Sequence, residues 1–389
     1  MEKNNVSTAA GDLIYLVSCA VNCETPGKKI CDEMDLKEVF ALARRHSLTA
    51  AAAYALESAG IHSLDFREEK YKAVRRSSFL DIERVKVLAE LEKHNIWYLP
   101  LKGIVLKGYY PKTVMREMSD NDILFDDEKC AEVKDIMEAL GFECTQYGVS
   151  NHDVYEKPLH LDFEMHKTLF DDSDERELSV YFKDIKKKLI KDAGNRCGYQ
   201  MKDEDFYIFL ICHLYKHYAL CGTGLRSLLD IYVFNKRFAD KLDRTYLCEE
   251  FNKIRLLEFE RGISKLADKT FSFQTLTERE LNELQFFIDS NTHGTLDNLM
   301  MQELKNDDSA SAKQKYVLKR VFPSHNSLKR SHPFVYRHKA IYPFFLLYRP
   351  FRGLIMNRKL VFSEIKRLKK YKKKEAAGKY NSQDNAKRK

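Results

Sequence analysis

The segment Leu159–His166 (LHLDFEMH) alternates between apolar and polar residues along its whole length. Successive side chains of a β-strand point to opposite faces, so the alternation predicts a strand with one face packed on a core. That apolar face would contain Leu159, Leu161, Phe163 and Met165. The opposite face would present four ionisable side chains to a cleft or to solvent: His160, Asp162, Glu164 and His166.

The preceding residues, 96–158, predict further strands and two helices. Strands are expected at Ile96–Leu101, Asp120–Phe125, Phe142–Tyr147 and His152–Glu156. A short helix at Ile104–Tyr110 would stop at Pro111, and a longer one at Asp127–Leu140 would stop at Gly141. We therefore expect a small mixed sheet in this part of the chain.

Helical sequence lies on both sides of this segment. A long helix is expected at Arg67–His94, and beyond Asp174 the clearest helices are Asp203–Leu220 and Leu225–Phe238. The predicted fold is therefore α/β (α+β), a small mixed sheet flanked by N- and C-terminal helical regions. We divide the chain into a helical region (1–95), an α/β core (96–173), a helical domain (174–328) and a basic aromatic tail (329–389), whose last residues, Gly378–Lys389, are expected to be disordered.

The composition favours a cytoplasmic protein. No apolar stretch approaches the roughly 18 residues of a membrane-spanning helix, and the N-terminal segment matches a secretory signal poorly. The nine cysteines are an odd number scattered along the chain, which does not fit a disulfide framework. Cys19, Cys23 and Cys31 cluster, but without a CxxC pair they fit reduced core thiols better than a zinc site.

Charge is divided unevenly along the 389 residues. Residues 329–389 contain 19 Lys and Arg against three Asp and Glu, whereas residues 1–328 contain 47 against 55. The tail also mixes aromatic and basic residues between Tyr336 and Leu360. Three interpretations stay open: the tail holds the protein peripherally at a membrane surface, it contacts the backbone of RNA or DNA, or its aromatic part packs on the acidic body.

The sequence Asp120-Asn121-Asp122 opens the second predicted strand. Residues two apart in a strand share a face, so the carboxylates of Asp120 and Asp122 are presented together. Two such carboxylates repel each other unless a cation neutralises them, and Mg²⁺ is the obvious candidate. A solvated turn at the start of the strand is the alternative. A third acid, from the strand that carries Asp162 and Glu164, would complete a site for two metal ions.

Other catalytic patterns are absent from the sequence. It contains no GxxxxGK[ST] loop, no GxGxxG after a strand, no HExxH and no GxSxG. The acidic residues of the central segment are therefore the strongest functional signal.

The order and spacing of the motifs resemble an uncharacterised bacterial nucleotidyltransferase family with the DNA polymerase β-like fold. The resemblance rests on YLPLKGIVLKGYYP, REMSDNDILF, LGFE and LHLDFEMH, with LARRHSLTAAAAYAL before them and ICHLYKH and GLRSLLDIY after them. It covers roughly residues 35–240, and the combination is far more specific than any one motif. It implies a sheet of the polymerase β-like nucleotidyltransferase type.

The resemblance also implies roles for the acidic residues. Asp120 and Asp122 match the metal-binding pair of the family. Glu164 matches its third acidic position, as general base or as a ligand of a second metal ion. Asp162 remains a competitor for that third position because it lies on the same strand face.

The phosphate-binding turn departs from the wider superfamily. Lys102 and Gly103 stand where the superfamily has Gly-Ser, a tight turn that holds the β- and γ-phosphates. Here a lysine precedes the glycine and no serine follows it, so the grip on the phosphates must differ. Lys102 and Arg116 would either contribute positive charge to the triphosphate or pair with nearby acids.

Polar residues of the predicted C-terminal helices match the family as well. His213 and His217 are four residues apart and share a helix face, and Arg226 and Asp230 follow on the next helix. With Asp162 and His166 they are candidates for lining a nucleotide or acceptor cleft. The alternative is that they make hydrogen bonds between packed helices.

Together these features predict transfer of a nucleoside monophosphate from an NTP to a hydroxyl or amine, with Mg²⁺ or Mn²⁺ as cofactor. The acceptor would be a small molecule, an RNA or a protein. The unusual Lys102-Gly103 pair leaves an alternative open, an NTP-binding or membrane-surface accessory protein without transfer activity.

Overall fold

The structure is a computed structural model that describes residues 7–172, 175–238, 240–290, 299–300, 304, 311–323, 325, 328, 332–356, 358, 365–366 and 368. The chain forms two compact units. The first, here called the body, contains Met1–Lys216 and Thr223–Thr292, and the second, the C-terminal unit, contains His217–Gly222 and His293–Lys389. Gly378–Lys389, expected to be disordered, lie outside the described residues.

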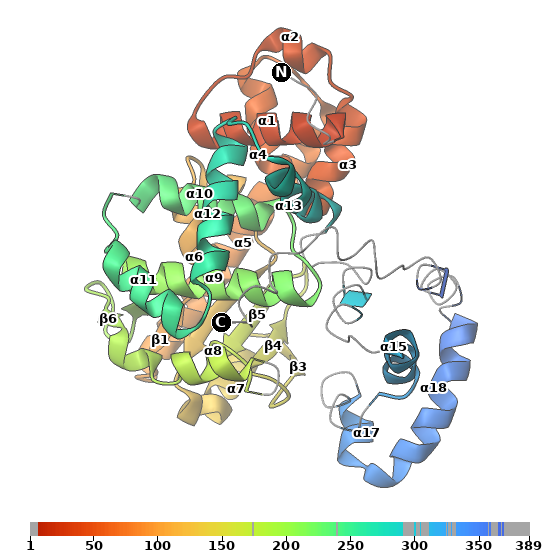
Figure 1. Cartoon of the computed structure of the whole chain (residues 1–389). Helices are drawn as coiled ribbons and strands as arrows, with labels where there is room; N and C mark the ends of the chain where they lie inside the picture. The colour runs from red at the N-terminus through yellow and green to blue at the C-terminus, as the bar shows by residue number, and fades with distance from the viewer. Residues whose placement is uncertain are drawn as a thin grey trace. The chain divides into compact units, whose positions relative to one another are not determined.

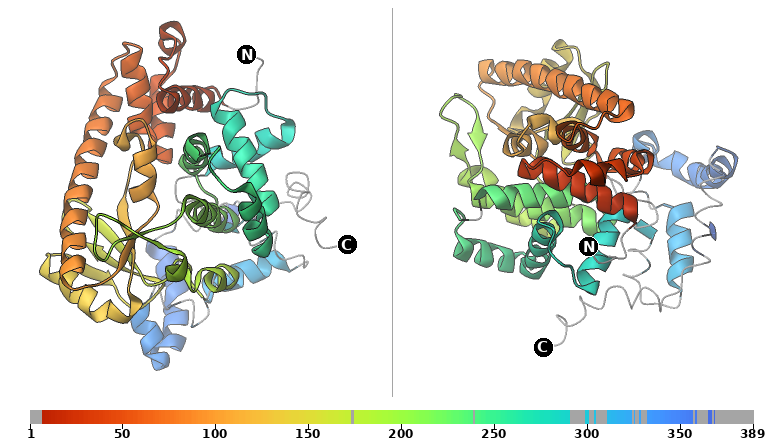
Figure 2. Two further views of the ribbon diagram at one scale, coloured as in Figure 1. Left: turned by 90° about the vertical axis from the view of Figure 1, so that its left-hand side faces the viewer. Right: turned by 90° about the horizontal axis from the view of Figure 1, so that it is seen from above.

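Five helices open the body: α1 (Thr8–Asn22), α2 (Lys28–Asp32), α3 (Leu36–His46), α4 (Thr49–Ser58) and α5 (Leu64–Lys93). The side chain of Asp35 starts α3 by accepting hydrogen bonds from the backbone N–H groups of Lys37 and Glu38. Four consecutive alanines of α4, residues 50–53, are buried, and their small side chains let α1 and α5 pack closely against this helix. The long helix α5 continues from α4 to the sheet (Figure 2).

A five-stranded mixed sheet forms the centre of the body. Its strands are β1 (Tyr98–Pro100), β2 (Asp120–Phe125), β3 (Glu143–Gln146), β4 (His152–Glu156) and β5 (Asp162–His166), in the order β1-β2-β5-β4-β3. The neighbours β2 and β5 run parallel, and the other pairs are antiparallel. Short helical turns connect β1 to β2: α6 (Gly103–Leu106), η1 (Lys107–Tyr109) and η2 (Thr113–Met115).

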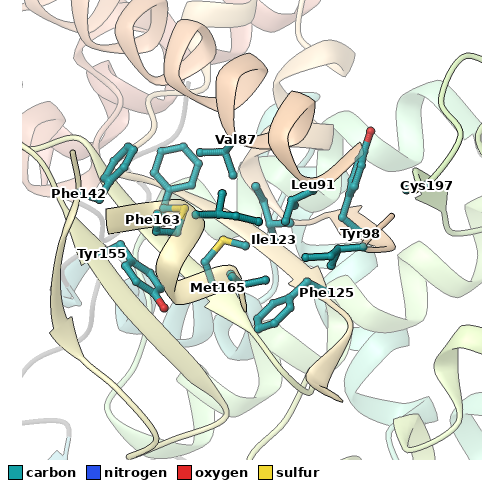
Figure 3. Close-up of a cluster of buried hydrophobic side chains, with 14 residues drawn as sticks. Val87, Leu91, Tyr98, Ile123, Phe125, Phe142, Tyr155, Phe163, Met165 and Cys197 are labelled. Atoms are coloured by element: carbon teal, nitrogen blue, oxygen red, sulfur yellow. The ribbon is translucent and has the colours of Figure 1, made fainter. Parts of the chain in front are cut away.

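One face of the sheet is buried under α5 and α7 (Cys130–Ala139), which follows the turn η3 (Asp127–Lys129). Ile123 of β2 and Phe163 of β5 pack there against Val87 of α5 (Figure 3). Val133 of α7 belongs to the same cluster, and all four side chains are fully buried. Since strand side chains alternate between faces, Asp120, Asp122 and Glu164 must point to the opposite face.

The remaining helices of the body follow β5 (Figure 1). They are α8 (Arg176–Phe182), η4 (Ile185–Lys188), α9 (Asp203–Leu220), α10 (Leu225–Phe238), α11 (Arg244–Lys253), α12 (Leu257–Phe271) and α13 (Glu278–Asp289). A two-stranded ribbon, β6 (Ile190–Lys191) and β7 (Tyr199–Gln200), precedes α9. Because α12 contacts α1 as well as α10, the helices of the body that follow β5 pack onto its N-terminal helices.

The described part of the C-terminal unit contains α15 (Ala312–Val321), α17 (Pro333–Arg337), η5 (Lys339–Ile341) and α18 (Tyr342–Met356). Phe345 of α18 packs with Leu328 and Val335 in a small buried cluster. Among the residues with described structure, no helix is both long and apolar enough to cross a membrane.

The predicted fold class is confirmed, with corrections to one strand and one helix. The strand expected at Leu159–His166 starts at Asp162, because Leu159 and His160 adopt left-handed φ values of 74° and 56°. Leu159 is consequently 69% exposed, so its expected place in the core was wrong. The helix expected at Ile104–Tyr110 is broken into α6 and η1.

The cysteines are free thiols in this structure. Cys19 and Cys31 are buried, whereas Cys23 is exposed. Burial raises the pKa of the Cys19 thiol to about 11, which keeps it protonated at neutral pH.

Candidate active site

The polar face of the sheet is acidic where the two parallel strands meet. In the register of β2 and β5, Asp120 lies opposite Asp162 and Asp122 lies opposite Glu164. Strands are about 4.8 Å apart, so residues in register on one face have neighbouring side chains. The pairing brings the DND motif and the LHLDFEMH motif to one place, as the sequence predicted.

Asn121, between the two aspartates, points the other way and is fully buried. Its side-chain amide donates to the backbone oxygen of Leu80 on α5 (3.0 Å), and its side-chain oxygen accepts a hydrogen bond from Arg84 (3.1 Å). These contacts fix β2 to α5. The middle residue of the motif therefore anchors the strand while its neighbours carry the carboxylates.

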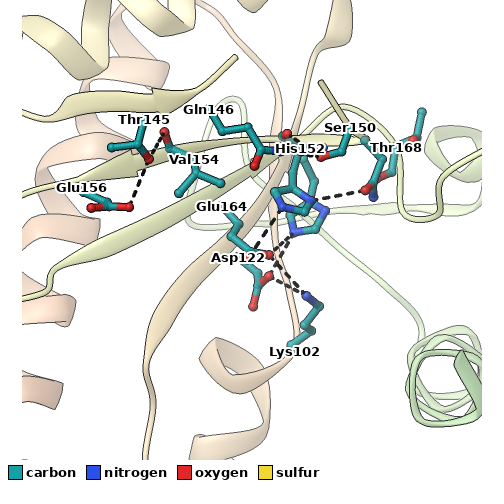
Figure 4. A network of polar contacts seen from close by, with 12 residues as sticks. Lys102, Asp122, Thr145, Gln146, Ser150, His152, Val154, Glu156, Glu164 and Thr168 are labelled. Carbon is teal, nitrogen blue, oxygen red and sulfur yellow. Dashed lines mark hydrogen bonds and ion pairs between the residues drawn. The ribbon is translucent and has the colours of Figure 1, made fainter. Parts of the chain in front are cut away.

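Lys102 provides a cation for the acidic face. Its Nζ lies 2.6 Å from Asp122 Oδ1 and 3.9 Å from Glu164 Oε2 (Figure 4). The residue adopts φ 45° and ψ −117°, a conformation that a side-chain-bearing residue rarely takes. This turn is stabilised by the hydrogen bond from Leu101 N to Asp122 O (3.0 Å) and begins helix α6.

Gly103 follows at a point of close approach. A β-carbon at this position would lie 3.2 Å from Arg116 Nη1 and 3.4 Å from Met118 Cγ. A side chain at this position would therefore require Arg116 to shift by a few tenths of an ångström, so the glycine allows the close approach of Arg116.

Two histidines complete the polar network beside Glu164. The Nε2 atom of His166 lies 2.9 Å from Asp122 Oδ1 and 3.4 Å from Glu164 Oε2. On the neighbouring strand β4, His152 lies opposite His166, and its Nε2 atom is 3.8 Å from Glu164 Oε1 (Figure 4). The imidazole ring centres are 5.0 Å apart.

His152 was not among the residues predicted for the site. Its strand was expected, and its position at the start of HDVYE is visible in the sequence. What links it to Glu164 is the register between β4 and β5, which depends on non-local pairing. Only a correct prediction of that register would have found it.

Burial and closely spaced charges set the pKa values of the acidic face. Burial, together with the negative charges of Asp122 and Glu164, raises the pKa of Asp120 to about 6. Burial would also raise the pKa of Asp122, but Lys102 and His166 outweigh it and hold that pKa well below its usual range. Burial alone would lower the Lys102 pKa, yet the surrounding carboxylates raise it, so its ammonium stays charged.

A second ionic group lies beside the acidic face, between the loop before β2 and helix α10. Arg116 Nη2 is 3.0 Å from Asp230 Oδ2, and Tyr110 donates a hydrogen bond to Asp230 Oδ1 (2.7 Å). Arg226 Nη1 donates to the backbone oxygen of Glu117 (3.0 Å), as Arg116 Nη1 also does (2.9 Å). The group holds α10 against the loop that leads into Asp120.

Arg226 differs from Arg116 in having no carboxylate in direct contact among the described residues. Its Nε atom is buried and has no hydrogen-bond partner in the described part of the chain. Burial and the nearby charge of Arg116 lower the Arg226 pKa to about 10, while Asp120 is close enough to oppose that shift. Arg226 thus brings a guanidinium with unused donors near Asp120.

The other predicted cleft residues lie differently. Asp162 is 4.0 Å from Arg76 Nη2, at the start of β5. His213 and His217 are partly buried on α9, and the ring centres of His213 and Phe209 are 6.1 Å apart. Their role in lining a cleft stays a prediction.

Comparisons with known proteins identify the family of this chain. A model of a protein family described as "Uncharacterised nucleotidyltransferase" matches residues 32–272. The chain belongs to this nucleotidyltransferase family. No curated protein sequence matches it. Among solved structures, the solution structure of the antibiotic-resistance factor ANT(2'')-Ia is similar at 10% identity and a TM-score of 0.25, over 51% of this nucleotidyltransferase and 92% of that chain.

The acidic face carries carboxylates of the kind that bind divalent cations, but its three carboxylates are not among the groups of three whose ligand atoms converge within 4.8 Å in the described structure. Asp120, Asp122 and Glu164 offer carboxylate oxygens, the ligands that Mg²⁺ and Mn²⁺ prefer. The side chain of Asp120 has no hydrogen bond or ion pair with any described residue, so its oxygens are available. His152, Glu164 and His166 offer ligand atoms within 4.8 Å of one another, and they are the only such group of three in the described structure.

Proposed function

We propose that this nucleotidyltransferase moves a nucleoside monophosphate from an NTP to an acceptor hydroxyl or amine and releases pyrophosphate. The observation that carries the proposal is the alignment of Asp122 with Glu164 across the parallel strands β2 and β5, next to Asp120 and the cation of Lys102. Carboxylates gathered on one sheet face beside cationic side chains suit a substrate whose phosphates arrive with metal ions.

The chain's own residues have distinct roles in this reaction. Asp120, Asp122 and Glu164 would hold Mg²⁺ or Mn²⁺, which when bound offsets the charge of the phosphates and lowers the pKa of the attacking hydroxyl. Glu164, with 27% of its side chain exposed, could instead act as the general base toward the acceptor, because it lies opposite Asp122 in the register of β2 and β5. Asp162 is the weaker candidate for the third acid because Arg76 lies beside it.

Binding of the triphosphate is assigned to the cations around the acids. Lys102 Nζ contacts Asp122 in this structure, and its ammonium would donate to a phosphate oxygen of the bound NTP. Gly103 keeps the turn close to Arg116. Arg116 is paired with Asp230, which leaves Arg226 as the guanidinium with donors available for the phosphates.

His166 is a positioning residue in this scheme. Its Nε2 atom lies within 3.4 Å of oxygens from both Asp122 and Glu164, so it fixes the two carboxylates relative to each other. The imidazole of His152 extends the donor set with nitrogen, a ligand better suited to Mn²⁺ than to Mg²⁺. The acceptor stays open among a small molecule, an RNA and a protein.

Pyrophosphate release tests the proposal. The wild type would be supplied with each NTP, Mg²⁺ or Mn²⁺ and a cell extract as the source of acceptor. We expect metal-dependent release that falls at least about 10³-fold in Asp120→Asn and in Asp122→Asn, because removing a transition-state charge partner costs several kcal/mol. Retained helical circular dichroism would show that both variants fold.

The same assay distinguishes this proposal from the alternative, an accessory protein without transfer activity. The ammonium of Lys102 already pairs with Asp122, where a metal ion would otherwise neutralise the carboxylate, and this contact favours the alternative. Metal-dependent NTP binding without pyrophosphate release under any condition would support it. Unchanged release in either aspartate variant would contradict the assignment of the acidic face.

A further inference from the structure

The C-terminal unit exposes an apolar stripe along one helix. On α18, Phe344 is 73% exposed, Leu347 and Phe351 are each 67% exposed, and Tyr348 is 58% exposed. These positions follow the spacing i, i+3, i+4 and i+7, which places all four on one helix face within an arc of about 100°. Large apolar side chains gathered in this way mark a surface that binds something apolar.

The opposite face of α18 is already used for packing. Phe345 lies in the buried cluster with Leu328 and Val335, and Tyr342 donates a hydrogen bond to the backbone oxygen of Pro323 (2.8 Å). Arg349 Nη1 donates to the backbone oxygen of Val321 at the end of α15 (3.1 Å). Residues 342, 345 and 349 thus define an inner face, and the stripe is the outer face of a helix that is already held in place.

Basic residues surround the stripe, and acidic ones are absent from this stretch of sequence. Residues 329–363 contain eight Lys and Arg and no Asp or Glu. Arg337 and Lys339 are exposed before the stripe, and Arg352 and Arg358 are exposed at its far end. An apolar helix face with cations at both ends has the chemistry of a helix that lies in the interface of an anionic membrane.

We propose that α18 docks the protein on an anionic lipid surface, with Phe344, Leu347, Tyr348 and Phe351 inserted among the acyl chains and the flanking Arg and Lys residues on the headgroups. At 15 residues the helix is shorter than the ~20 that span a bilayer, and it contains Pro350, so it suits a position parallel to the surface. No Lys or Arg lies between Ala340 and Tyr348, which disfavours contact of the stripe with a nucleic acid backbone.

Vesicle flotation with the full chain tests this proposal. The wild type would be mixed with vesicles of phosphatidylcholine alone or of phosphatidylcholine with phosphatidylserine. We expect it to float with the anionic vesicles and to be released as the salt concentration rises, since the cations are screened. The variant Phe344→Ser/Leu347→Ser/Phe351→Ser should bind at least tenfold less.

A matched variant separates the stripe from general surface hydrophobicity. Leu64, Val85 and Val180 of the body are 66%, 66% and 65% exposed, so Leu64→Ser/Val85→Ser/Val180→Ser removes three apolar side chains of similar fractional exposure elsewhere. This control should float like the wild type. Equal flotation of the stripe variant, or no flotation of the wild type, would overturn the proposal. Stripe-dependent binding of single-stranded RNA without vesicle binding would instead assign the face to nucleic acid.

Discussion

The body and the C-terminal unit use apolar side chains in opposite ways. The largest fully buried side chains of the described structure, among them Phe163, Phe209 and Phe251, all belong to the body. In the C-terminal unit, Phe334, Phe344 and other large apolar residues are more than half exposed. Net charge also differs along the chain: residues 1–328 are net negative, and residues 329–389, which lie in the C-terminal unit, are net positive. The body thus keeps its largest aromatic side chains in its core, whereas the described part of the C-terminal unit presents several large apolar side chains on its surface.

The largest expected difference between the two regions is in packing. Phe163→Ala removes a fully buried ring from the sheet core and should lower the free energy of unfolding by about 3–5 kcal/mol. Phe344→Ala, at a position that is 73% exposed, should change it by less than about 0.5 kcal/mol. Denaturant unfolding of both variants measures this difference. A similar loss in both would show that α18 is packed as tightly as the body.

A smaller effect is expected on substrate affinity. Arg226→Met removes a guanidinium near Asp120 and should raise the KM for NTP roughly 10- to 100-fold, because hydrogen bonds to charged groups contribute about 1.5–3 kcal/mol. Arg352→Met removes an exposed arginine of the C-terminal unit and should leave KM unchanged. Steady-state kinetics of the two variants would refute the role of Arg226 if their KM values were alike.

The smallest expected effect is a pH dependence of the body's stability. His46 is fully buried, and its Nδ1 atom accepts a hydrogen bond from the backbone N–H of Leu225 (3.2 Å). Burial lowers its pKa from 6.5 to about 4. Between these values the unfolded chain binds the proton and the folded one does not, so stability falls as the pH falls through this window.

Unfolding at two pH values checks this expectation. The shift makes folding about 1.4 kcal/mol less favourable at pH 5.5 than at pH 7.5. His46→Gln should lose that part of the pH dependence. If the variant and the wild type have the same dependence, the pKa of His46 does not differ between the folded and the unfolded protein.

The sequence predicted the elements better than their contacts. The alternation in LHLDFEMH identified β5 and its acids, because period-two patterning is local. It misplaced Leu159 because nothing in the pattern indicates that Leu159 and His160 adopt left-handed conformations. The meeting of the two acidic motifs was predicted, but the partners of individual side chains could not be read from spacing. The pair of Arg116 and Asp230 and the approach of His152 to Glu164 depend on how helices and strands pack.

The most direct test of the acidic face as a nucleotidyl-transfer site follows the label of an NTP. The protein would be incubated with NTP labelled at the α-phosphate or at the γ-phosphate, with a divalent cation and extract, beside Asp122→Asn. The account predicts that α-label enters the acceptor, that γ-label leaves as pyrophosphate, and that both depend on Asp122. Entry of γ-label into the acceptor, or α-label transfer by Asp122→Asn at the wild-type rate, would contradict it.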